Sequence, residues 1–73
     1  MNLTDITPTG HLIAEINGEH YKLRRWERGY WRANKVKRDQ HGFWYVCDDD
    51  DFIIRDGVFL WREVGWDLRK EIV

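Results

Sequence analysis

The sequence predicts a small all-β fold, an antiparallel barrel or meander of five to six short strands built from hairpins. Turn signals recur about every 8–12 residues, as in small β folds. The segments between the turns are rich in aromatic and β-branched residues, and the 73-residue chain has a single Pro. A chain of this length forms one domain. We place it at residues 11–73, after a polar lead-in at residues 1–10.

The first predicted hairpin turns at Asn17 and Gly18. An Asn-Gly pair favours a type I′ turn, which requires positive φ at both central residues. This turn pairs residue 16 with 19 and residue 12 with 23, and cross-strand partners share a face. One face should then carry Leu12, Ala14, Ile16, Tyr21 and Leu23. The other should carry His11, Ile13, Glu15, His20, Lys22 and Arg24.

The second predicted hairpin joins residues 30–38 to residues 42–47 through the polar turn at 39–42. Gly42 can take the left-handed conformation in this turn. Residues 43–47 are aromatic and β-branched, which favours a strand. On the first strand, Lys35 and Lys37 continue the face of Trp31 and Ala33 as charges.

The third predicted hairpin turns at Asp56 and Gly57, and both of its faces are apolar. One face should carry Ile53, Val58 and Leu60, and the other Phe52, Ile54, Phe59 and Trp61. Each apolar face needs cover from the fold or from a dimer partner, so the sequence leaves monomer and homodimer open. Residues 66–73 fit either a last strand or a short helical turn, because Leu68 and Ile72 are four residues apart.

Composition and charge exclude several classes of protein. The chain is 42% hydrophobic and 34% charged, with a net charge of −1. This is too apolar for a disordered chain, and no apolar run approaches the roughly 20 residues of a membrane span. The start of the chain lacks the pattern of a signal peptide. One cysteine cannot form an internal disulfide, which favours a reducing compartment. We therefore expect a cytoplasmic protein that does not contact a membrane.

The sequence offers no convincing catalytic or metal-binding set. It contains no Ser, and Cys47 is better explained as a small hydrophobic strand residue than as a nucleophile paired with a histidine. The three His and one Cys lack the close spacing of zinc ligands. We expect neither enzymatic activity nor a cofactor. The acidic run lacks the pattern of a calcium loop and is predicted to be a solvated connection between strands. It comprises Asp48, Asp49, Asp50 and Asp51.

A basic stretch interleaved with aromatic residues is the strongest functional signal. Residues 22–38 hold eight Lys and Arg against one Glu, whereas residues 39–73 hold nine acids and four bases. The simplest explanation is that these charges pair with the acidic half of the chain. Five Trp are difficult to bury in so small a core, and we expect Trp26 and Trp66 to be exposed. The candidate binding residues are Arg24, Arg25, Trp26, Arg28, Trp31, Arg32, Lys35, Lys37 and Arg38.

The leading functional hypothesis is a non-enzymatic protein–protein interaction module, acting as an accessory or inhibitory protein. Trp, Tyr and Arg are the residue types enriched in binding hot spots. The acidic run would add an electrostatic contact with a basic partner. The alternative is direct nucleic-acid binding through residues 22–38, with arginines and lysines on phosphates and with Trp26 and Trp31 stacking on bases.

Overall fold

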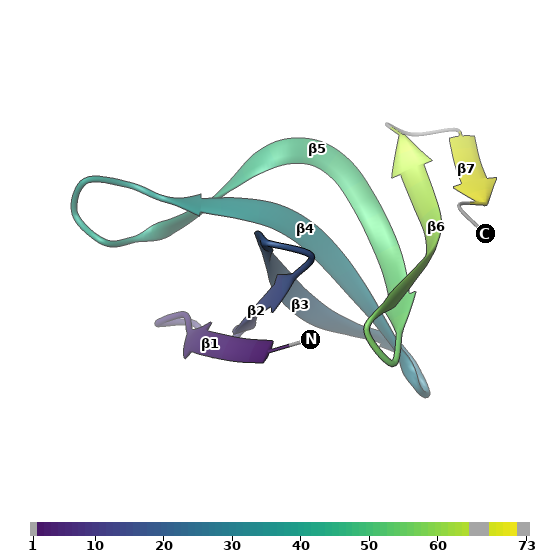
Figure 1. The fold of residues 1–73 in the computed structure, drawn as a ribbon, viewed down its shortest axis with the longest axis horizontal. Coiled ribbons are helices and arrows are strands. Elements are labelled where there is room, and N and C mark those ends of the chain that lie inside the picture. Colours follow the sequence, from purple (N-terminus) through teal and green to yellow (C-terminus); the bar gives the residue numbers. More distant parts are fainter. Residues whose placement is uncertain (1, 65–67, 72–73) are drawn as a thin grey trace.

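The fold is an open antiparallel meander of seven strands, in which each strand pairs with its neighbours in sequence (Figure 1). The computed structural model describes residues 2–64 and 68–71. The all-β prediction is confirmed, with the meander and not the barrel as the architecture, and the described residues include no helix. The strands are β1 (Asn2–Ile6), β2 (Leu12–Ile16), β3 (Glu19–Glu27), β4 (Tyr30–Arg38), β5 (Trp44–Arg55), β6 (Val58–Val64) and β7 (Leu68–Glu71).

The two ends of the chain account for the additional strand and for the open question at the C-terminus. Within the segment predicted as a polar lead-in, Asn2–Ile6 forms strand β1, which pairs antiparallel with β2. Leu68–Glu71 forms strand β7 on β6, so the described part of residues 66–73 is a strand and not a helical turn. Strands β1 and β7 are the two edges of the sheet.

The first hairpin, β2–β3, has the predicted register. Leu12 pairs with Leu23 and Ile16 with Glu19. Asn17 and Gly18 both have positive φ, at 53° and 83°, as a type I′ turn requires. Here the local turn chemistry and the pattern of apolar residues specify the same register.

The pairing of β4 with β5 contains a large bulge. Asn34 pairs with Asp51 and Val36 with Val46, so residues 47–50 of β5 lie opposite Lys35 alone. A bulge bends its strand and increases the local twist. The long β5 arches accordingly in Figure 1. The acidic run therefore lies within strand β5, and the predicted solvated connection between strands is wrong.

The third hairpin, β5–β6, keeps its predicted register only near the turn. Ile54 pairs with Phe59 as expected, but Ile53 pairs with Trp61. Leu60 is therefore an extra residue in β6, which moves every later pair by one position. The Asp56-Gly57 turn, in which Asp56 has a φ of 53°, sets the pairing next to the turn but does not predict the extra residue further along β6.

The two faces of the sheet have different contents. We call the side that carries the largest apolar cluster the core face; Leu12, Trp31, Phe52 and Phe59 pack against the cluster. We call the opposite side the polar face. By alternation along the strands it carries the buried Ile13, Val36 and Ile53 together with charged residues. The core-face cluster consists of Ala14, Ile16, Tyr21, Leu23, Ala33 and Ile54.

Side chains of the β4–β5 hairpin form hydrogen bonds with Asp5 of β1. The carboxylate of Asp5 accepts a hydrogen bond from the indole Nε1–H of Trp44 at 2.8 Å and one from Arg38 Nη2 at 3.0 Å. The ring of Trp44 also lies 5.0 Å from that of His20. The hydrogen bond from Trp44 is the main cause that lowers the pKa of Asp5 below its ordinary value of 3.8.

Candidate binding surface

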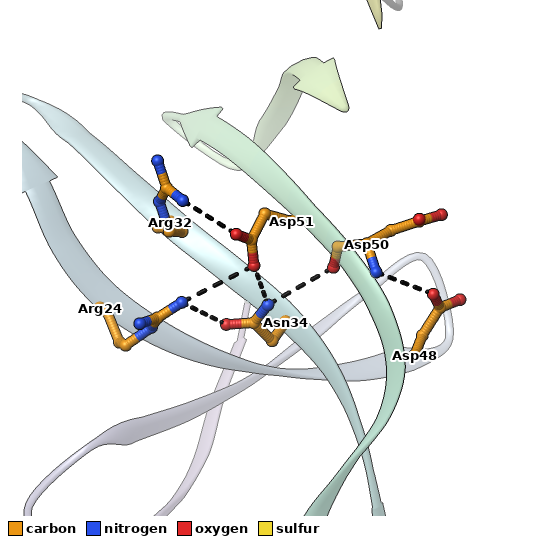
Figure 2. Close-up of polar contacts among 6 residues, drawn as sticks. All are labelled: Arg24, Arg32, Asn34, Asp48, Asp50 and Asp51. Carbon is orange, nitrogen blue, oxygen red and sulfur yellow. Dashed lines mark hydrogen bonds and ion pairs between the residues drawn. The ribbon is translucent and has the colours of Figure 1, made fainter. Parts of the chain in front are cut away.

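A polar network joins β3, β4 and β5 on the polar face (Figure 2). Arg32 Nη1 donates to Asp51 Oδ2 at 2.8 Å, and Arg24 Nη2 lies 3.7 Å from Asp51 Oδ1. Asn34 lies between them, because its Oδ1 accepts from Arg24 Nη2 at 2.8 Å and its Nδ2 donates to Asp51 Oδ1. Two of the predicted binding arginines therefore share one carboxylate within the molecule.

The neighbouring Asp50 uses the other side of the strand. Its buried carboxylate accepts from Arg62 Nε at 2.6 Å, and Arg62 lies on β6 opposite Phe52 of the core face. The backbone N–H of Asp50 donates to Asp48 Oδ1 at 2.9 Å (Figure 2). The acidic run thus places two consecutive carboxylates on opposite faces, each with arginine partners. Neither Asp50 nor Asp51 is a free acidic surface.

Other members of the basic stretch also have acidic partners. Lys35 Nζ lies 3.6 Å from a carboxylate oxygen of Glu19, and Arg38 pairs with Asp5. Arg24, Arg32, Lys35 and Arg38 therefore have carboxylates within 4 Å. Within the described part of the chain, three of the seven predicted basic residues have no ion pair: Arg25, Arg28 and Lys37.

Arginine side chains lie over aromatic rings at several points of the sheet. Among the described residues, Arg25 lies 5.0 Å from the ring centroid of Trp31, and Arg32 lies 5.4 Å from that of Trp26. Trp26 is half-buried and packs edge-on against Tyr30. Each cation–π pair at an exposed site contributes about 0.5–1 kcal/mol. Trp66, the other tryptophan expected to be exposed, lies outside the described residues.

A groove of 540 Å³ opens where β2 begins. Its apolar lining includes Leu12, the buried Leu23 and Trp31. Arg24 and Arg25 also line it, but the guanidinium of Arg24 bonds Asn34 and lies near Asp51 on the polar face. The sequence pattern indicated Arg25 and Trp31 as binding residues but gave no reason to associate them with Leu12. The full lining consists of Gly10, His11, Leu12, Leu23, Arg24, Arg25 and Trp31.

Exposed apolar side chains lie at the end of the β4–β5 hairpin and on the edge strand β1. Phe43 is 61% exposed and Tyr45 is 48% exposed. On β1, Leu3 and Ile6 are exposed beside the groove-forming strand β2. Contiguous exposed apolar surface is a mark of interaction sites. None of these residues belongs to the predicted binding set.

The described residues show no catalytic pairing of Cys47 with a histidine. Cys47 is exposed in the β5 bulge, and its Sγ lies 3.5 Å from the carbonyl oxygen of Lys35. The hydrogen bond of His11 Nδ1 is with Thr9, and that of His41 Nε2 is with Gln40. The described side chains form no group of three or more potential metal ligands. No helix in the described part of the chain has the length and apolarity needed to cross a bilayer.

Comparisons with protein families, with curated proteins and with solved structures found no match to this chain.

Proposed function

We propose that this chain is a non-enzymatic binding module whose partner is a protein, in an accessory or inhibitory role. The observation that carries the proposal is the internal neutralisation of the basic stretch. Arg24, Arg32 and Arg38 each have a carboxylate partner, as does Lys35. Nucleic-acid affinity comes largely from cations that neutralise phosphates and release counterions. A cation that already pairs with a carboxylate contributes less to that attraction.

The surface that remains suits a protein partner. It combines an exposed Arg25 stacked on Trp31, an apolar groove beside them, and exposed aromatic rings at Phe43 and Tyr45. Interface centres in proteins are enriched in aromatic residues and Arg. The proposed binding surface is therefore the Arg/Trp-rich one, without the acidic run, because Asp50 and Asp51 hold arginines within the fold.

The single cysteine is exposed, and we propose the cytoplasm as the location, where a free thiol stays reduced. The proposal covers both a monomer and a homodimer. The edge strand β1, with its exposed Leu3 and Ile6, could face solvent in a monomer or pair with a second copy in a dimer. Sedimentation velocity at two concentrations distinguishes the two states.

The test compares peptides with nucleic acids as ligands of the ¹⁵N-labelled protein. Peptides are selected from a random library on the immobilised protein and then titrated at near-physiological salt. A short DNA duplex and single-stranded DNA and RNA are titrated at low and near-physiological salt. We expect amide shifts with the peptides that persist in salt, and oligonucleotide shifts that vanish.

Oligonucleotide shifts that cluster in residues 22–38 and persist at near-physiological salt, without binding of any selected peptide, would overturn the proposal. They would establish direct nucleic-acid binding instead. The charge-reversal variant Lys37→Glu sharpens this arm, because Lys37 has no ion pair among the described residues. It should flatten the salt dependence of nucleic-acid binding and leave peptide binding unchanged.

A further inference from the structure

We infer that the groove at the start of β2 binds an extended acidic peptide segment, in which a carboxylate and an apolar side chain lie two residues apart. This inference rests on the proposed protein partner and names the chemistry that the partner presents. Two features of the groove carry it: its charge and the spacing of its side chains.

The charge of the groove is complementary to a carboxylate. Its lining includes two arginines and one histidine, and no acidic residue. Arg24 is already shared between Asn34 and Asp51. Arg25 is exposed and has no carboxylate partner among the described residues. The ring of Trp31 orients its guanidinium, and an oriented guanidinium can bind a carboxylate in bidentate fashion. Arg25 is therefore the cation that the groove offers to a ligand.

The side chains of the groove have the spacing of an extended chain. Leu23 and Arg25 are two residues apart on β3 and so lie on the same face. Their side chains are separated by about 6.5–7 Å, the distance over which a strand repeats one face. A peptide that lies extended across the groove, over the core face of β3, presents its own residues i and i+2 at the same spacing. An apolar side chain can then contact Leu12 and Leu23 while a carboxylate reaches Arg25.

The groove is bounded by the start of β2 and by the longer strand β3. Strand β2 pairs with β3 only as far as Leu23, whereas β3 continues to Glu27. Gly10 and His11, which precede β2, line the groove beside this part of β3. The groove volume of 540 Å³ lies within the usual range of binding clefts, about 300–1,000 Å³.

A nucleotide fits the same groove less well. The guanidinium of Arg25 covers one side of the Trp31 ring, where a base would stack. The neighbouring cations Arg32 and Lys35 pair with Asp51 and Glu19, so they do not form a track for a phosphodiester backbone. These observations favour a carboxylate peptide over a polynucleotide at this site.

The experiment titrates the ¹⁵N-labelled full chain with two peptides, acetyl-Thr-Glu-Thr-Leu-Thr-amide and acetyl-Thr-Leu-Thr-Glu-Thr-amide, which differ in the order of Glu and Leu. Matched peptides replace Glu by Gln, or place Glu and Leu next to each other. We expect the i, i+2 acidic peptide to shift the amides of Leu23 and Arg25 and the indole N–H of Trp31. The Gln peptide should bind at least about tenfold more weakly, because it loses a charge-assisted hydrogen bond.

Two variants of the protein distinguish a specific contact from general charge. Arg25→Gln should weaken the acidic peptide about tenfold, whereas Arg28→Gln, which removes the same charge from the adjoining turn outside the groove, should leave its affinity unchanged. Arg25→Lys should give an intermediate affinity, because it keeps the charge and loses the planar guanidinium. Each variant is checked for an unchanged amide spectrum away from the site.

Three results would overturn the inference. The first is equal affinity for the Glu and Gln peptides, and the second is an equal loss for Arg25→Gln and Arg28→Gln. The third is binding of oligo-dT at near-physiological salt that Arg25→Gln abolishes. If library-selected peptides instead shift Phe43 and Tyr45 and ignore Arg25→Gln, the groove is excluded and the protein-partner proposal stands. If oligonucleotides alone bind in salt, both fail.

Discussion

The core face and the polar face of this sheet are buried by different means. The core face relies on apolar contact, and its cluster around Tyr21 and Ile54 is packed by the rings of Phe52 and Phe59. The polar face combines a few buried aliphatic residues with the Arg24–Asn34–Asp51–Arg32 network. Apolar burial is non-directional, whereas a hydrogen-bonded network demands particular partners. We therefore expect apolar burial to dominate the stability of the core face, and the network to favour the observed pairing of β4 with β5.

The largest expected effect is on the core face. Ile54→Ala removes a fully buried side chain from the cluster and should lower the free energy of unfolding by about 2–5 kcal/mol. Urea unfolding followed by tryptophan fluorescence measures this. The control is Val58→Ala on the same hairpin, which truncates a side chain that is 52% exposed and should change stability by less than about 0.5 kcal/mol. Equal effects of the two variants would contradict the assignment of the core face.

The next effect tests the polar face. Asp51→Ala leaves Arg24, Arg32 and the amide of Asn34 without their shared acceptor, and should cost about 1–3 kcal/mol in the same assay. The control is Asp56→Asn, which removes an exposed carboxylate 4.0 Å from Arg55, a pair of small energetic value, and keeps a residue type that tolerates the positive φ of this turn. A network that contributes nothing would give the two variants the same urea midpoint.

A substitution in the β2–β3 turn tests the contribution of the turn conformation without altering side chains on either face of the sheet. Gly18 has a φ of 83°, and a Cβ added there would meet no atom within 4 Å. Gly18→Ala should therefore cost about 1–2 kcal/mol through conformation and not through a clash. Gly18→Asn should recover part of the loss, because Asn tolerates the left-handed region. If the Asn variant is no more stable than the Ala variant in urea, the turn does not supply this energy.

The smallest expected effect concerns the contact of β1 with the β4–β5 hairpin. Because the folded protein lowers the pKa of Asp5 below 3.8, this carboxylate stabilises the fold above that pH. The contribution is lost as the pH falls through the lowered pKa. Asp5→Asn should flatten the fall in urea midpoint below about pH 4 and reduce stability at neutral pH. If the urea midpoint falls equally below about pH 4 in the wild type and the variant, the stabilising role of Asp5 is contradicted.

The sequence predicts the elements that local chemistry specifies. The β2–β3 hairpin was predictable to the residue, because Asn17-Gly18 sets the turn and the alternation of Leu12, Ala14 and Ile16 requires the same register. Strand β1 was not, because it is a short edge strand whose exposed residues lack an alternating burial pattern. Its sheet position depends on pairing with β2, a tertiary contact.

The acidic run shows where local reasoning fails. Asp is depleted in strands, so four consecutive Asp indicate a connection. Arginines from β3, β4 and β6 reverse that preference by pairing with Asp50 and Asp51 on opposite faces. The excess of bases in residues 22–38 and the excess of acids in residues 39–73 were the available signal. It suggested that the two segments pair, but it could not give the bulge that aligns them.

The groove was only partly predictable. Arg25 and Trp31 follow from the enrichment of basic and aromatic residues, and they face each other because the β3–β4 register pairs them. Leu12 joins them because β2 begins opposite Leu23, while β3 continues to Glu27. That difference in strand length depends on the bounds of each element, which local patterns specify least well.

The strictly sequential strand order has a consequence for folding kinetics. Every pair in a meander closes a short loop, so chain entropy opposes each step only weakly and the contact order is low for a β protein. The bonds of Asp5 to Arg38 and Trp44 are different, because they join residues 33 and 39 positions apart. They should form after the transition state, so Asp5→Asn would accelerate unfolding and leave the refolding rate nearly unchanged.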